Sequence, residues 1–467
     1  MTPFPTREAS FLKVDRYGVL GAARSGQAAA ALLLELGKTV TLFDDFAKED
    51  DPACQALAQN GVRLRFGAPG GDLEDVQALV CSPGIPLDHA LLEAAARRGL
   101  PVLAEVELGW LCAPLSRIAA ITGTNGKTTV TMLVEKIVAD AGLPSRAAGN
   151  IGLPLCEAIR QEPARLDQTV FALEVSSFQL DQTERFAPEV AVILNITPDH
   201  LDRHPTMEEY ARAKERVTVN QTPEQTLVVN QDDPFCLAIA ARARARVKRF
   251  SLERRVEDGA WLDGDLIVLE QPGRKPHRLM SMSDLKMVGL HNVANAMAAA
   301  CVAEALGLGR GRLAQSLAAF RAAPHRMEVV GELNGVTYID DSKATNLDAM
   351  RRAIQSFPGG IHLIAGGRDK NSPFATITEE LAGRAVAIYL IGEAAAPMAA
   401  AWSGRIECVQ CGTLERALEQ AAERAKGCEV IMLSPGCASF DQFRSYAHRG
   451  EVFAQWVRRR LAAAPLA

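Results

Sequence analysis

The sequence predicts an α/β protein with parallel sheets and about three domains. Its 467 residues correspond to roughly three domains of about 150 residues each. Short apolar segments alternate with helix-like segments along the chain, which is the pattern of parallel strands joined by crossover helices. Several apolar segments end in small or polar residues, and α/β sheets bind ligands at that end of their strands.

The first hundred residues are expected to form a βαβ unit. We expect strands at 17–20, 39–43 and 76–81, a tight turn at 21–26, and a helix at 27–36 that ends at a glycine. The glycines at 18, 21 and 26 do not match the GxGxxG pattern of dinucleotide sites. A helix that begins at a strand end still suits a phosphate group.

A second unit is expected to begin near Leu115. The predicted elements are a strand at 117–121, a loop at 123–129, helices at 130–141 and 291–305, strands at 169–175, 190–196 and 226–230, and a small β insertion at 261–262 and 266–269. The expected helix at 130–141 is followed by Gly142 and Pro144, which end helices.

A third unit is expected to begin near Pro324. Strands are predicted at 336–339, 361–365, 387–391 and 430–433, with a polar loop at 340–346 before a helix. A strand-like segment at 405–409 precedes Cys408 and Cys411, which have CxxC spacing but no second pair for zinc. We interpret these two cysteines as ordinary thiols.

Composition and charge exclude several functional classes. Hydrophobic residues make up 48% and charged residues 23%, which is typical of a folded globular chain. The net charge of -5 does not suggest a nucleic-acid or membrane-surface protein. The N-terminal segment has no apolar core of a secretory signal, and the longest apolar stretch is far short of the ~20 residues that span a bilayer. We therefore expect a cytoplasmic protein with reduced cysteines, no nucleic-acid partner and no membrane insertion.

The strongest functional motif is the loop GTNGKTT at 123–129. Glycines let a backbone turn its N–H groups toward phosphates, a lysine reaches the β- and γ-phosphates, and a hydroxyl contacts Mg²⁺. Lys127 and Thr128 supply these groups, with Thr129 adjacent. The strict GxxxxGK[ST] spacing fails because Ile121 occupies the first glycine position. The motif is thus a variant phosphate loop in which Gly123 takes that role, and it predicts nucleoside triphosphate binding.

Two further strand ends carry candidate ligands. Glu174 ends an apolar strand and suits Mg²⁺ beside a phosphate loop. His200 follows the next strand and is expected to contact a metal or the substrate, whereas His204 is expected to be structural. Tyr210 and Lys214 share one helix face by their spacing, and that spacing alone favours an exposed lysine.

The third unit offers a smaller set of polar residues near strand ends. Arg326 suits a phosphate and Asp341 a ribose. Lys343 suits the developing charge of a phosphoryl group. Each of these residues taken singly is as compatible with an ordinary surface position.

Together these motifs resemble the Mur ligase family of peptidoglycan precursor synthesis. The matching segments, in family order, are GTNGKTT (123–129), EVSSFQL (174–180), NITPDHLDRH (195–204), the Lys214 helix, GLHNVANA (289–296), PHRME (324–328), DDSKATN (340–346) and SPGCASFDQF (434–443). The resemblance implies a Rossmann-like UDP-substrate domain at 1–112, a central P-loop-type ATPase domain at 113–322 and a Rossmann-like amino-acid-binding domain at 323–467.

The resemblance also implies the reaction. Blocks such as AGGRDK (365–370) most resemble members that add D-glutamate to UDP-N-acetylmuramoyl-L-alanine, with ATP, two Mg²⁺ ions and an acyl phosphate. A monomer is expected. Another Mur-type ligase or a folylpolyglutamate-type ligase remains open, as does a nucleotide switch, which needs neither His200 nor Lys214.

Site residues carried over from the family fall into five sets. The catalytic set is Lys127, His200, Lys214 and Lys343, with Lys214 carbamylated. The metal set is Thr128, Glu174, His200 and Lys214. The ATP set is Gly123, Thr124, Asn125, Gly126, Lys127, Thr128, Thr129, Asn292, Asn295, Arg326 and Asp341. The UDP-substrate set is Ala23, Arg24, Ser25, Asp44, Ser82 and Asn150. The D-glutamate set is Thr345, Lys370, Ser439, Phe440 and Tyr446, where the family often has Leu and Phe at the last two positions.

Overall fold

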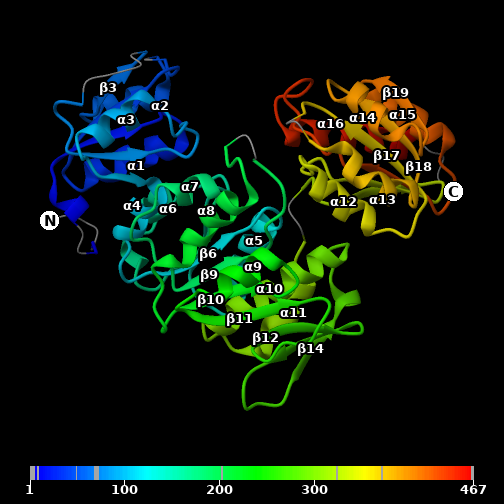
Figure 1. Cartoon of the computed structure of the whole chain (residues 1–467), viewed down its shortest axis with the longest axis horizontal. Helices are drawn as coiled ribbons and strands as arrows, with labels where there is room; N and C mark the ends of the chain where they lie inside the picture. The colour runs from blue at the N-terminus through cyan, green and yellow to red at the C-terminus, as the bar shows by residue number, and fades with distance from the viewer. Residues whose placement is uncertain are drawn as a thin grey trace. The chain divides into compact units, whose positions relative to one another are not determined.

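The computed structural model describes residues 6–7, 10–48, 50–67, 73–200, 203–321, 324–369 and 372–463. Over these residues the chain forms three sheets of five, nine and six strands with helices packed on them (Figure 1). Contacts divide the chain into two compact units. The first comprises Met1–Ile196, His204–Ser281 and Asn295–Leu317, and the second comprises Thr197–Arg203, Met282–Ala294 and Ala318–Ala467.

The first sheet is parallel throughout, in the order β3-β2-β1-β4-β5. Its strands are β1 (Arg16–Leu20), β2 (Thr39–Asp44), β3 (Arg63–Phe66), β4 (Ala78–Cys81) and β5 (Val102–Ala104), and its helices are α1 (Arg24–Glu35), α2 (Pro52–Gln59), α3 (Ala90–Arg97) and α4 (Glu105–Leu111). The strand order reverses between β1 and β4, which is where open α/β sheets bind ligands.

The second sheet has the order β14-β13-β12-β11-β10-β9-β6-β8-β7. Its strands are β6 (Arg117–Thr122), β7 (Ser145–Gly149), β8 (Val170–Glu174), β9 (Val190–Ile193), β10 (Thr226–Asn230), β11 (Arg246–Ser251), β12 (Gly259–Asp263), β13 (Leu266–Glu270) and β14 (His277–Ser281). The β12–β13 and β13–β14 pairs are antiparallel and form the expected β insertion. The strands around β6 are parallel, so their polar ends meet at one edge.

Helices alternate with the strands of the second sheet, and two more lie between that sheet and the third. They are α5 (Lys127–Asp140), α6 (Leu155–Gln161), α7 (Ser177–Asp181), α8 (Met207–Val219), α9 (Pro234–Ala240), α10 (Leu290–Ala305) and α11 (Leu313–Ala319). The helix α8 begins with a capping box, in which the side chains of Thr206 and Glu209 bind each other's backbone N–H groups. This cap fixes where α8 begins and therefore which face carries Lys214.

One hydrophobic core runs through the first two sheets. It contains Leu32 of α1, Ile159 of α6 and Phe171 of β8, and α1 packs against α6. Burying side chains of this size contributes roughly 1.5–3 kcal/mol each, so this core joins the first two sheets into one unit.

The third sheet has the order β15-β16-β20-β17-β18-β19, with only β15 antiparallel to its neighbour. Its strands are β15 (Glu328–Leu333), β16 (Val336–Asp340), β17 (Ile361–Gly366), β18 (Ala385–Ile391), β19 (Cys408–Gly412) and β20 (Val430–Leu433), and its helices are α12 (Leu347–Gln355), α13 (Thr378–Ala382), α14 (Ala395–Trp402), α15 (Leu414–Arg424) and α16 (Tyr446–Ala463). Short 3-10 helices lie at Ser10–Lys13, Pro163–Arg165, Met282–Asp284, Arg310–Arg312 and Phe374–Ile377.

The predicted α/β class with parallel sheets is confirmed, with some shifted boundaries. The helices expected at 27–36 and 130–141 begin three residues earlier, at Arg24 and Lys127, because both helices start inside the polar turn. The strand expected at 405–409 is wrong, since β19 is Cys408–Gly412 and contains both cysteines. The domain boundaries at 112/113 and 322/323 stay a prediction. Among the described residues, no helix is both long and apolar enough to span a membrane.

Candidate active site

The loop between β6 and α5 is shaped by two glycines with positive φ. Gly123 has a φ of 148° and Gly126 a φ of 86°, conformations that favour glycine. A Cβ on Gly126 would lie 2.4 Å from the side-chain oxygen of Asn295, so α10 packs closely on the loop. No side chain caps the start of α5. Its first N–H groups and its dipole therefore favour an anion at the loop.

Asn195, which follows β9, fixes the opposite side of this loop. Its side-chain oxygen accepts the Asn125 N–H at 2.8 Å, and its amide donates to the Asn125 carbonyl at 3.1 Å. Its own carbonyl accepts the Thr124 N–H at 2.9 Å. Sequence reasoning missed Asn195 as a site residue. The available signal was an amide side chain directly after an apolar strand.

Two lysines converge on one carbonyl oxygen of the loop. Lys127 Nζ donates to the carbonyls of Gly123 and Thr124, both at 2.8 Å. Lys214 Nζ donates to the same Gly123 carbonyl at 3.0 Å. Lys214 is 1% exposed, and its Nζ lies 4.3 Å from the centre of the Tyr210 ring. The expectation of an exposed lysine from spacing alone is therefore wrong, and α8 carries Lys214 into the loop.

Thr128, at the start of α5, contacts the carboxylate of Glu174 at the end of β8. Thr128 Oγ1 donates to Glu174 Oε2 at 2.7 Å, and the Asn150 amide donates to Glu174 Oε1 at 3.0 Å. Glu174 is 3% exposed. A hydroxyl and a carboxylate are hard oxygen donors of the kind that Mg²⁺ prefers, so these residues fit that ion. Thr129 is buried in the first turn of α5.

His204 has the structural role that the sequence predicted. It is buried, its Nε2 lies 3.1 Å from Ser177 Oγ, and its ring packs 5.3 Å from the Tyr210 ring. Tyr210 in turn lies beneath Lys214 and within 3.4 Å of Thr124 Oγ1. His204 thus supports the aromatic ring on which Lys214 rests.

His200 lies in a loop that belongs to the second unit. It has a φ of 54°, and its backbone N–H donates to Asp199 Oδ1 at 3.0 Å. The other oxygen of Asp199 accepts the Asn346 amide at 2.9 Å, while Asn346 also caps α12 through the Ala349 N–H. The metal role of His200 stays a prediction.

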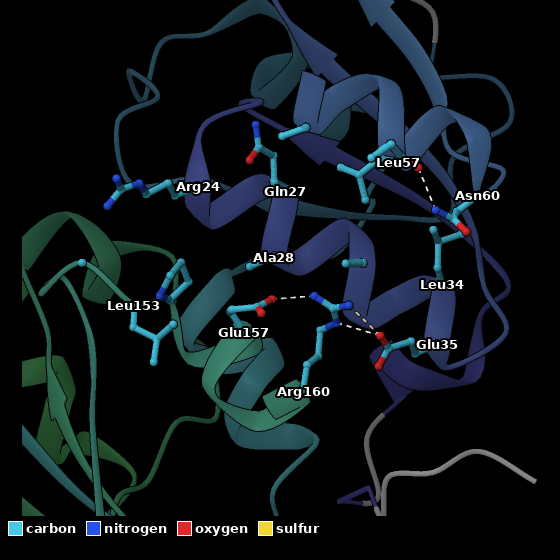
Figure 2. Close-up of a pocket in the computed structure, with 15 residues that line it drawn as sticks. Arg24, Gln27, Ala28, Leu34, Glu35, Leu57, Asn60, Leu153, Glu157 and Arg160 are labelled. Carbon is cyan, nitrogen blue, oxygen red and sulfur yellow. Dashed lines mark hydrogen bonds and ion pairs between the residues drawn. The ribbon is translucent and has the colours of Figure 1, made fainter. Parts of the chain in front are cut away.

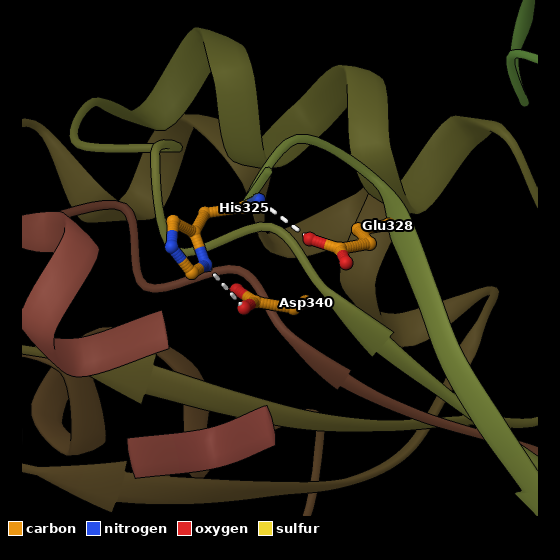
Figure 3. A group of neighbouring side chains, drawn as sticks. All are labelled: His325, Glu328 and Asp340. Carbon is orange, nitrogen blue, oxygen red and sulfur yellow. Dashed lines mark hydrogen bonds and ion pairs between the residues drawn. The ribbon is translucent and has the colours of Figure 1, made fainter. Parts of the chain in front are cut away.

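His325, Glu328 and Asp340 form a cluster of neighbouring side chains in the second unit, shown in Figure 3. His325 Nδ1 lies 2.7 Å from Asp340 Oδ2, and the His325 N–H donates to Glu328 at 2.9 Å. The hydrogen bond with Asp340 raises the pKa of His325. The three side chains satisfy one another as an ion pair and a backbone cap. Arg326, between them, remains half-buried.

Asp341 and Lys343 follow on the same loop. Burial raises the pKa of Asp341 to about 7, and its carboxylate accepts the Ser434 hydroxyl at 2.9 Å and the Met327 N–H at 3.2 Å. Lys343 Nζ lies 3.7 Å from the centre of the Tyr446 ring. The structure thus brings Lys343 together with one member of the predicted D-glutamate set.

Arg449 in α16 is a second residue that sequence reasoning missed. Its side chain is fully buried and donates to the Ser342 hydroxyl at 2.9 Å and the Cys437 carbonyl at 3.2 Å. Burial lowers its pKa to about 10. A buried arginine that binds two loops fixes their spacing, and in the sequence it is one of several arginines in that helix.

The remaining members of the ATP and D-glutamate sets are placed as follows. Ser439 is 2% exposed and Phe440 is 64% exposed, and Thr345 is half-buried. Lys370 lies outside the described residues. Asn292 is buried and donates to the Val288 carbonyl at 2.8 Å. Asn292 belongs to the second unit and Asn295 to the first, although both lie on α10.

The predicted UDP-substrate residues gather at the carboxyl edge of the first sheet, except Asn150. Ala23 precedes α1, and Arg24 and Ser25 form its first turn. The Ser82 hydroxyl after β4 donates to the Gly21 carbonyl at 3.3 Å. Asp44 at the end of β2 accepts the Ala22 N–H at 2.7 Å. Asn150 instead lies beside Glu174 in the second sheet.

A groove of about 750 Å³ runs along α1, α2 and α6 (Figure 2). Arg160 bridges Glu35 and Glu157 on one wall, and Ala28, Leu34 and other apolar side chains line the floor. Arg24 lies at one end, is exposed and has no hydrogen-bond partner among the described residues. The polar groups of the wall therefore pair with one another.

Family models match two parts of the chain. The Mur ligase middle domain matches residues 121–303, and the domain described as "Mur ligase, glutamate ligase domain" matches residues 325–437. A protein from Koribacter versatilis named UDP-N-acetylmuramoylalanine--D-glutamate ligase is 41% identical over 94% of this chain and 96% of its own. A protein of the same name from Acidobacterium capsulatum is 41% identical over 96% of each chain.

Solved structures share the fold at low sequence identity. A pseudomurein peptide ligase type C from Methanothermus fervidus has a TM-score of 0.60 and 18% identity, covering 96% of this chain and 100% of its own. A MurF ligase from Thermotoga maritima in complex with ADP has a TM-score of 0.59 and 17% identity, covering 90% of this chain and 96% of its own.

Proposed function

The chain belongs to the Mur ligase family, and from that premise we propose that it is an ATP-dependent ligase that joins D-glutamate to UDP-N-acetylmuramoyl-L-alanine in peptidoglycan precursor synthesis. The close relatives' name supplies the two substrates. The observation in this chain that carries the chemistry is the pairing of Thr128 with Glu174 beside the Lys127 loop. That arrangement suits phosphoryl transfer.

The proposed reaction has two steps. The terminal carboxylate of the L-alanyl group attacks the γ-phosphorus of ATP, which forms an acyl phosphate and releases ADP. The amine of D-glutamate then attacks the acyl carbon, and the tetrahedral intermediate expels inorganic phosphate to leave the amide. Lys127 balances the charge of the γ-phosphoryl group, and the uncapped start of α5 binds the other phosphates.

Two Mg²⁺ ions are part of the proposal. Thr128 and Glu174 would hold one ion, and His200 and carbamylated Lys214 are each proposed as ligands of the second. Bound Mg²⁺ neutralises charge on the phosphate oxygens. The buried carboxylate of Glu174, next to a hydroxyl and an amide rather than an arginine, supports the first of these assignments.

The packing of Lys214 supports its carbamylation. Its ammonium and that of Lys127 share the Gly123 carbonyl, and two like charges close together in a buried site repel each other. Addition of CO₂ to the neutral amine gives a carbamate anion and releases a proton. The change replaces a buried cation with an anion beside Lys127.

Further roles are proposed for residues of α10 and of the segment after it. Asn292, Asn295, Arg326 and Asp341 contact the nucleotide, Lys343 balances the acyl phosphate, and Thr345, Lys370, Ser439, Phe440 and Tyr446 hold D-glutamate. Residues 1–112, 113–322 and 323–467 are the proposed UDP-substrate, ATPase and amino-acid domains. We also propose that the enzyme acts as a monomer in the cytoplasm, where ATP and nucleotide-linked sugars are available, and that it serves cell division and cell shape through the wall.

Phosphate release tests the proposal. The reaction contains ATP, Mg²⁺ and UDP-N-acetylmuramoyl-L-alanine, with D-glutamate, L-glutamate, L-lysine or diaminopimelate added separately. We expect release with D-glutamate alone, and its loss in Lys127→Ala. Release with another amino acid overturns the D-glutamate assignment, and release without any amino acid or UDP substrate overturns the ligase assignment.

A further inference from the structure

His325 and Asp340 form a buried ion pair that has no part in the reaction proposed above. The Asp340 side chain is 0% exposed and that of His325 is 13% exposed, and Figure 3 shows the imidazole ring facing the carboxylate. Removal of one member of such a pair leaves a buried charge without a partner. The next residue in the chain after each member, Arg326 and Asp341, is proposed to contact the nucleotide.

The backbone of α16 packs directly on this pair. A Cβ placed on Gly450 would clash with His325 Nδ1 and would lie 2.7 Å from Asp340 Oδ2, so the helix comes this close only because residue 450 is a glycine. Opposite charges attract each other more strongly where water is excluded. Glu328 and Glu451 are the other acids near the ring, and the hydrogen bond with Asp340 is the main cause that raises its pKa.

Arg326 lies between two residues with positive φ. His325 has a φ of 66° and Met327 a φ of 47°, conformations that cost energy in residues with a side chain. They persist only where surrounding contacts impose them. The His325 ring is held by Asp340 at 2.7 Å, and the Met327 N–H donates to Asp341 Oδ1 at 3.2 Å. The direction of Arg326 therefore depends on one such contact on each side.

The same pair also fixes the loop that carries Lys343. The Lys343 N–H donates to the His325 carbonyl at 3.1 Å. Asp340 Oδ1 accepts the Ser342 N–H at 2.9 Å, while its other oxygen faces the imidazole ring. The segment with Arg326 and the segment with Lys343 are thus joined by bonds that meet at the ion pair.

We propose that Asp340 is a positioning residue for the phosphate-binding groups of the second unit. Its ion pair with protonated His325 holds the two segments together. The pair thereby sets the direction of Arg326 toward the nucleotide and of Lys343 toward the acyl phosphate. The inference rests on the proposed function for the roles of Arg326 and Lys343. Asp340 and His325 act only through these neighbours and touch no substrate themselves.

A double-mutant cycle on the full chain, measured by calorimetry with ATP and Mg²⁺, tests this proposal. Asp340→Asn keeps the shape of the side chain and removes its charge, and His325→Gln removes the imidazole cation. Each variant is expected to weaken ATP binding about tenfold or more, and the double variant no more than the weaker-binding single variant. Losses that multiply in the double variant would show that the two residues act independently, which overturns the role of the pair.

The matched control is Glu429→Gln, which removes the acid partner of another buried histidine of the third sheet. His362 is 1% exposed, and its Nε2 lies 3.1 Å from Glu429 Oε2. This pair lies at the amino end of β17 and β20, whereas Asp340 ends β16. Glu429→Gln is expected to leave ATP affinity unchanged. An equal loss of ATP affinity in Glu429→Gln and Asp340→Asn overturns the positioning role, because any weakening of the sheet would then suffice.

The His325 ring offers a readout that does not depend on ATP. Its NMR titration is expected above the ordinary pKa of histidine in the unmodified protein and at lower pH in Asp340→Asn, where burial disfavours the cation without the carboxylate that offsets it. A titration that is the same in both proteins overturns the ion pair. The thermal midpoint shows whether each variant is folded, and His325→Gln alone serves if Asp340→Asn is not.

The outcomes separate this inference from the proposed function. Unchanged ATP affinity in folded Asp340→Asn overturns the positioning role even if D-glutamate is ligated. Loss of ATP affinity in folded Asp340→Asn, with none in Glu429→Gln, supports the role even if phosphate release fails with D-glutamate. In the ligation assay, the KM for ATP is expected to rise in Asp340→Asn, with the KM for the UDP substrate unchanged.

Discussion

At the scale of single residues, the charges around the Gly123 carbonyl define the site. Lys127 and Lys214 both donate to that oxygen, one from the start of α5 and the other from the middle of α8. Thr128 turns the next side chain of α5 toward Glu174. Two adjacent residues of α5 thus point at different groups. Lys127 contacts the loop carbonyls, and the hydroxyl of Thr128 contacts the Glu174 carboxylate.

Removal of the Thr128 hydroxyl tests the proposed metal contact. Thr128→Val is expected to lower kcat/KM for ATP at least about 100-fold, because Glu174 loses its hydroxyl partner and the metal a ligand. Thr131→Val is the matched control, since Thr131 is buried on the same helix and its hydroxyl has no hydrogen-bond partner. Equal activity in the two variants would contradict the assignment of Thr128.

Carbamylation of Lys214 is directly observable. Protein equilibrated with ¹³C-bicarbonate is expected to show a carbamate signal by NMR. The signal should be absent in Lys214→Ala and present in Lys136→Ala, which removes a half-exposed lysine paired with Asp140 on α5. A spectrum of the unmodified protein without a carbamate signal would count against the anionic form of Lys214.

At the scale of elements, the phosphate loop depends on the backbone of Gly126. Gly126 and Gly142 both have a φ of 86°, so an alanine at either position is strained by about 1–2 kcal/mol. A Cβ at Gly126 would also meet Asn295, whereas a Cβ at Gly142 meets nothing within 4 Å. The two glycines therefore separate backbone strain from steric contact with α10.

The paired substitutions have different expected effects. Gly142→Ala is expected to lower stability by about 1–2 kcal/mol and to leave ATP affinity unchanged. Gly126→Ala is expected to lower stability by at least as much and, in addition, to weaken ATP binding at least about tenfold by calorimetry, because the loop or the Asn295 side chain must shift. Unchanged ATP affinity in Gly126→Ala would show that the loop does not bind the nucleotide.

The helix α4 carries a buried acid that should make stability depend on pH. Burial raises the pKa of Glu105 from 4.5 to about 7; one of its oxygens accepts the Cys156 N–H and the other has no partner. Between pH 4.5 and 7 the carboxyl group of Glu105 is therefore protonated in the folded state and ionised in the unfolded state. Stability from this group is present below pH 4.5 and is lost as the pH rises toward 7.

Glu105→Gln should remove this dependence. The free energy of unfolding of the variant minus that of the unmodified protein is expected to rise by about 2 kcal/mol as the pH goes from 5.5 to 8. The measurement is the thermal midpoint of both proteins across that range. The pH dependence is the informative readout, because the new amide group also lacks a partner and lowers stability at every pH. Parallel curves for the two proteins would contradict the shifted pKa.

The elements also show what the sequence could and could not predict. β10 and β20 are placed to the residue because β-branched and apolar runs between polar turns identify buried strands. β3 was missed, since only half of its side chains face the core and its sequence alternates arginine with apolar residues. The motif around Lys127 was predicted from spacing. Asn195 and Arg449 were missed because their roles depend on contacts between distant segments.

At the scale of the whole molecule, the two compact units divide the proposed chemistry. The first unit contains the phosphate loop, Glu174 and Lys214. The second contains His200, Arg326, Asp341 and Lys343. The helix α10 contributes Asn292 to one unit and Asn295 to the other. In the proposed reaction the acyl phosphate must form where D-glutamate can reach it before water does.

The transfer of oxygen from substrate to phosphate tests this central claim most directly. UDP-N-acetylmuramoyl-L-alanine labelled with ¹⁸O in its terminal carboxylate is incubated with ATP, Mg²⁺, D-glutamate and the protein, and the released phosphate is examined by mass spectrometry. An acyl phosphate predicts one ¹⁸O atom in each phosphate, since the bridging oxygen leaves with phosphorus when the amine attacks carbon. Phosphate without the label would contradict the proposed ligase mechanism.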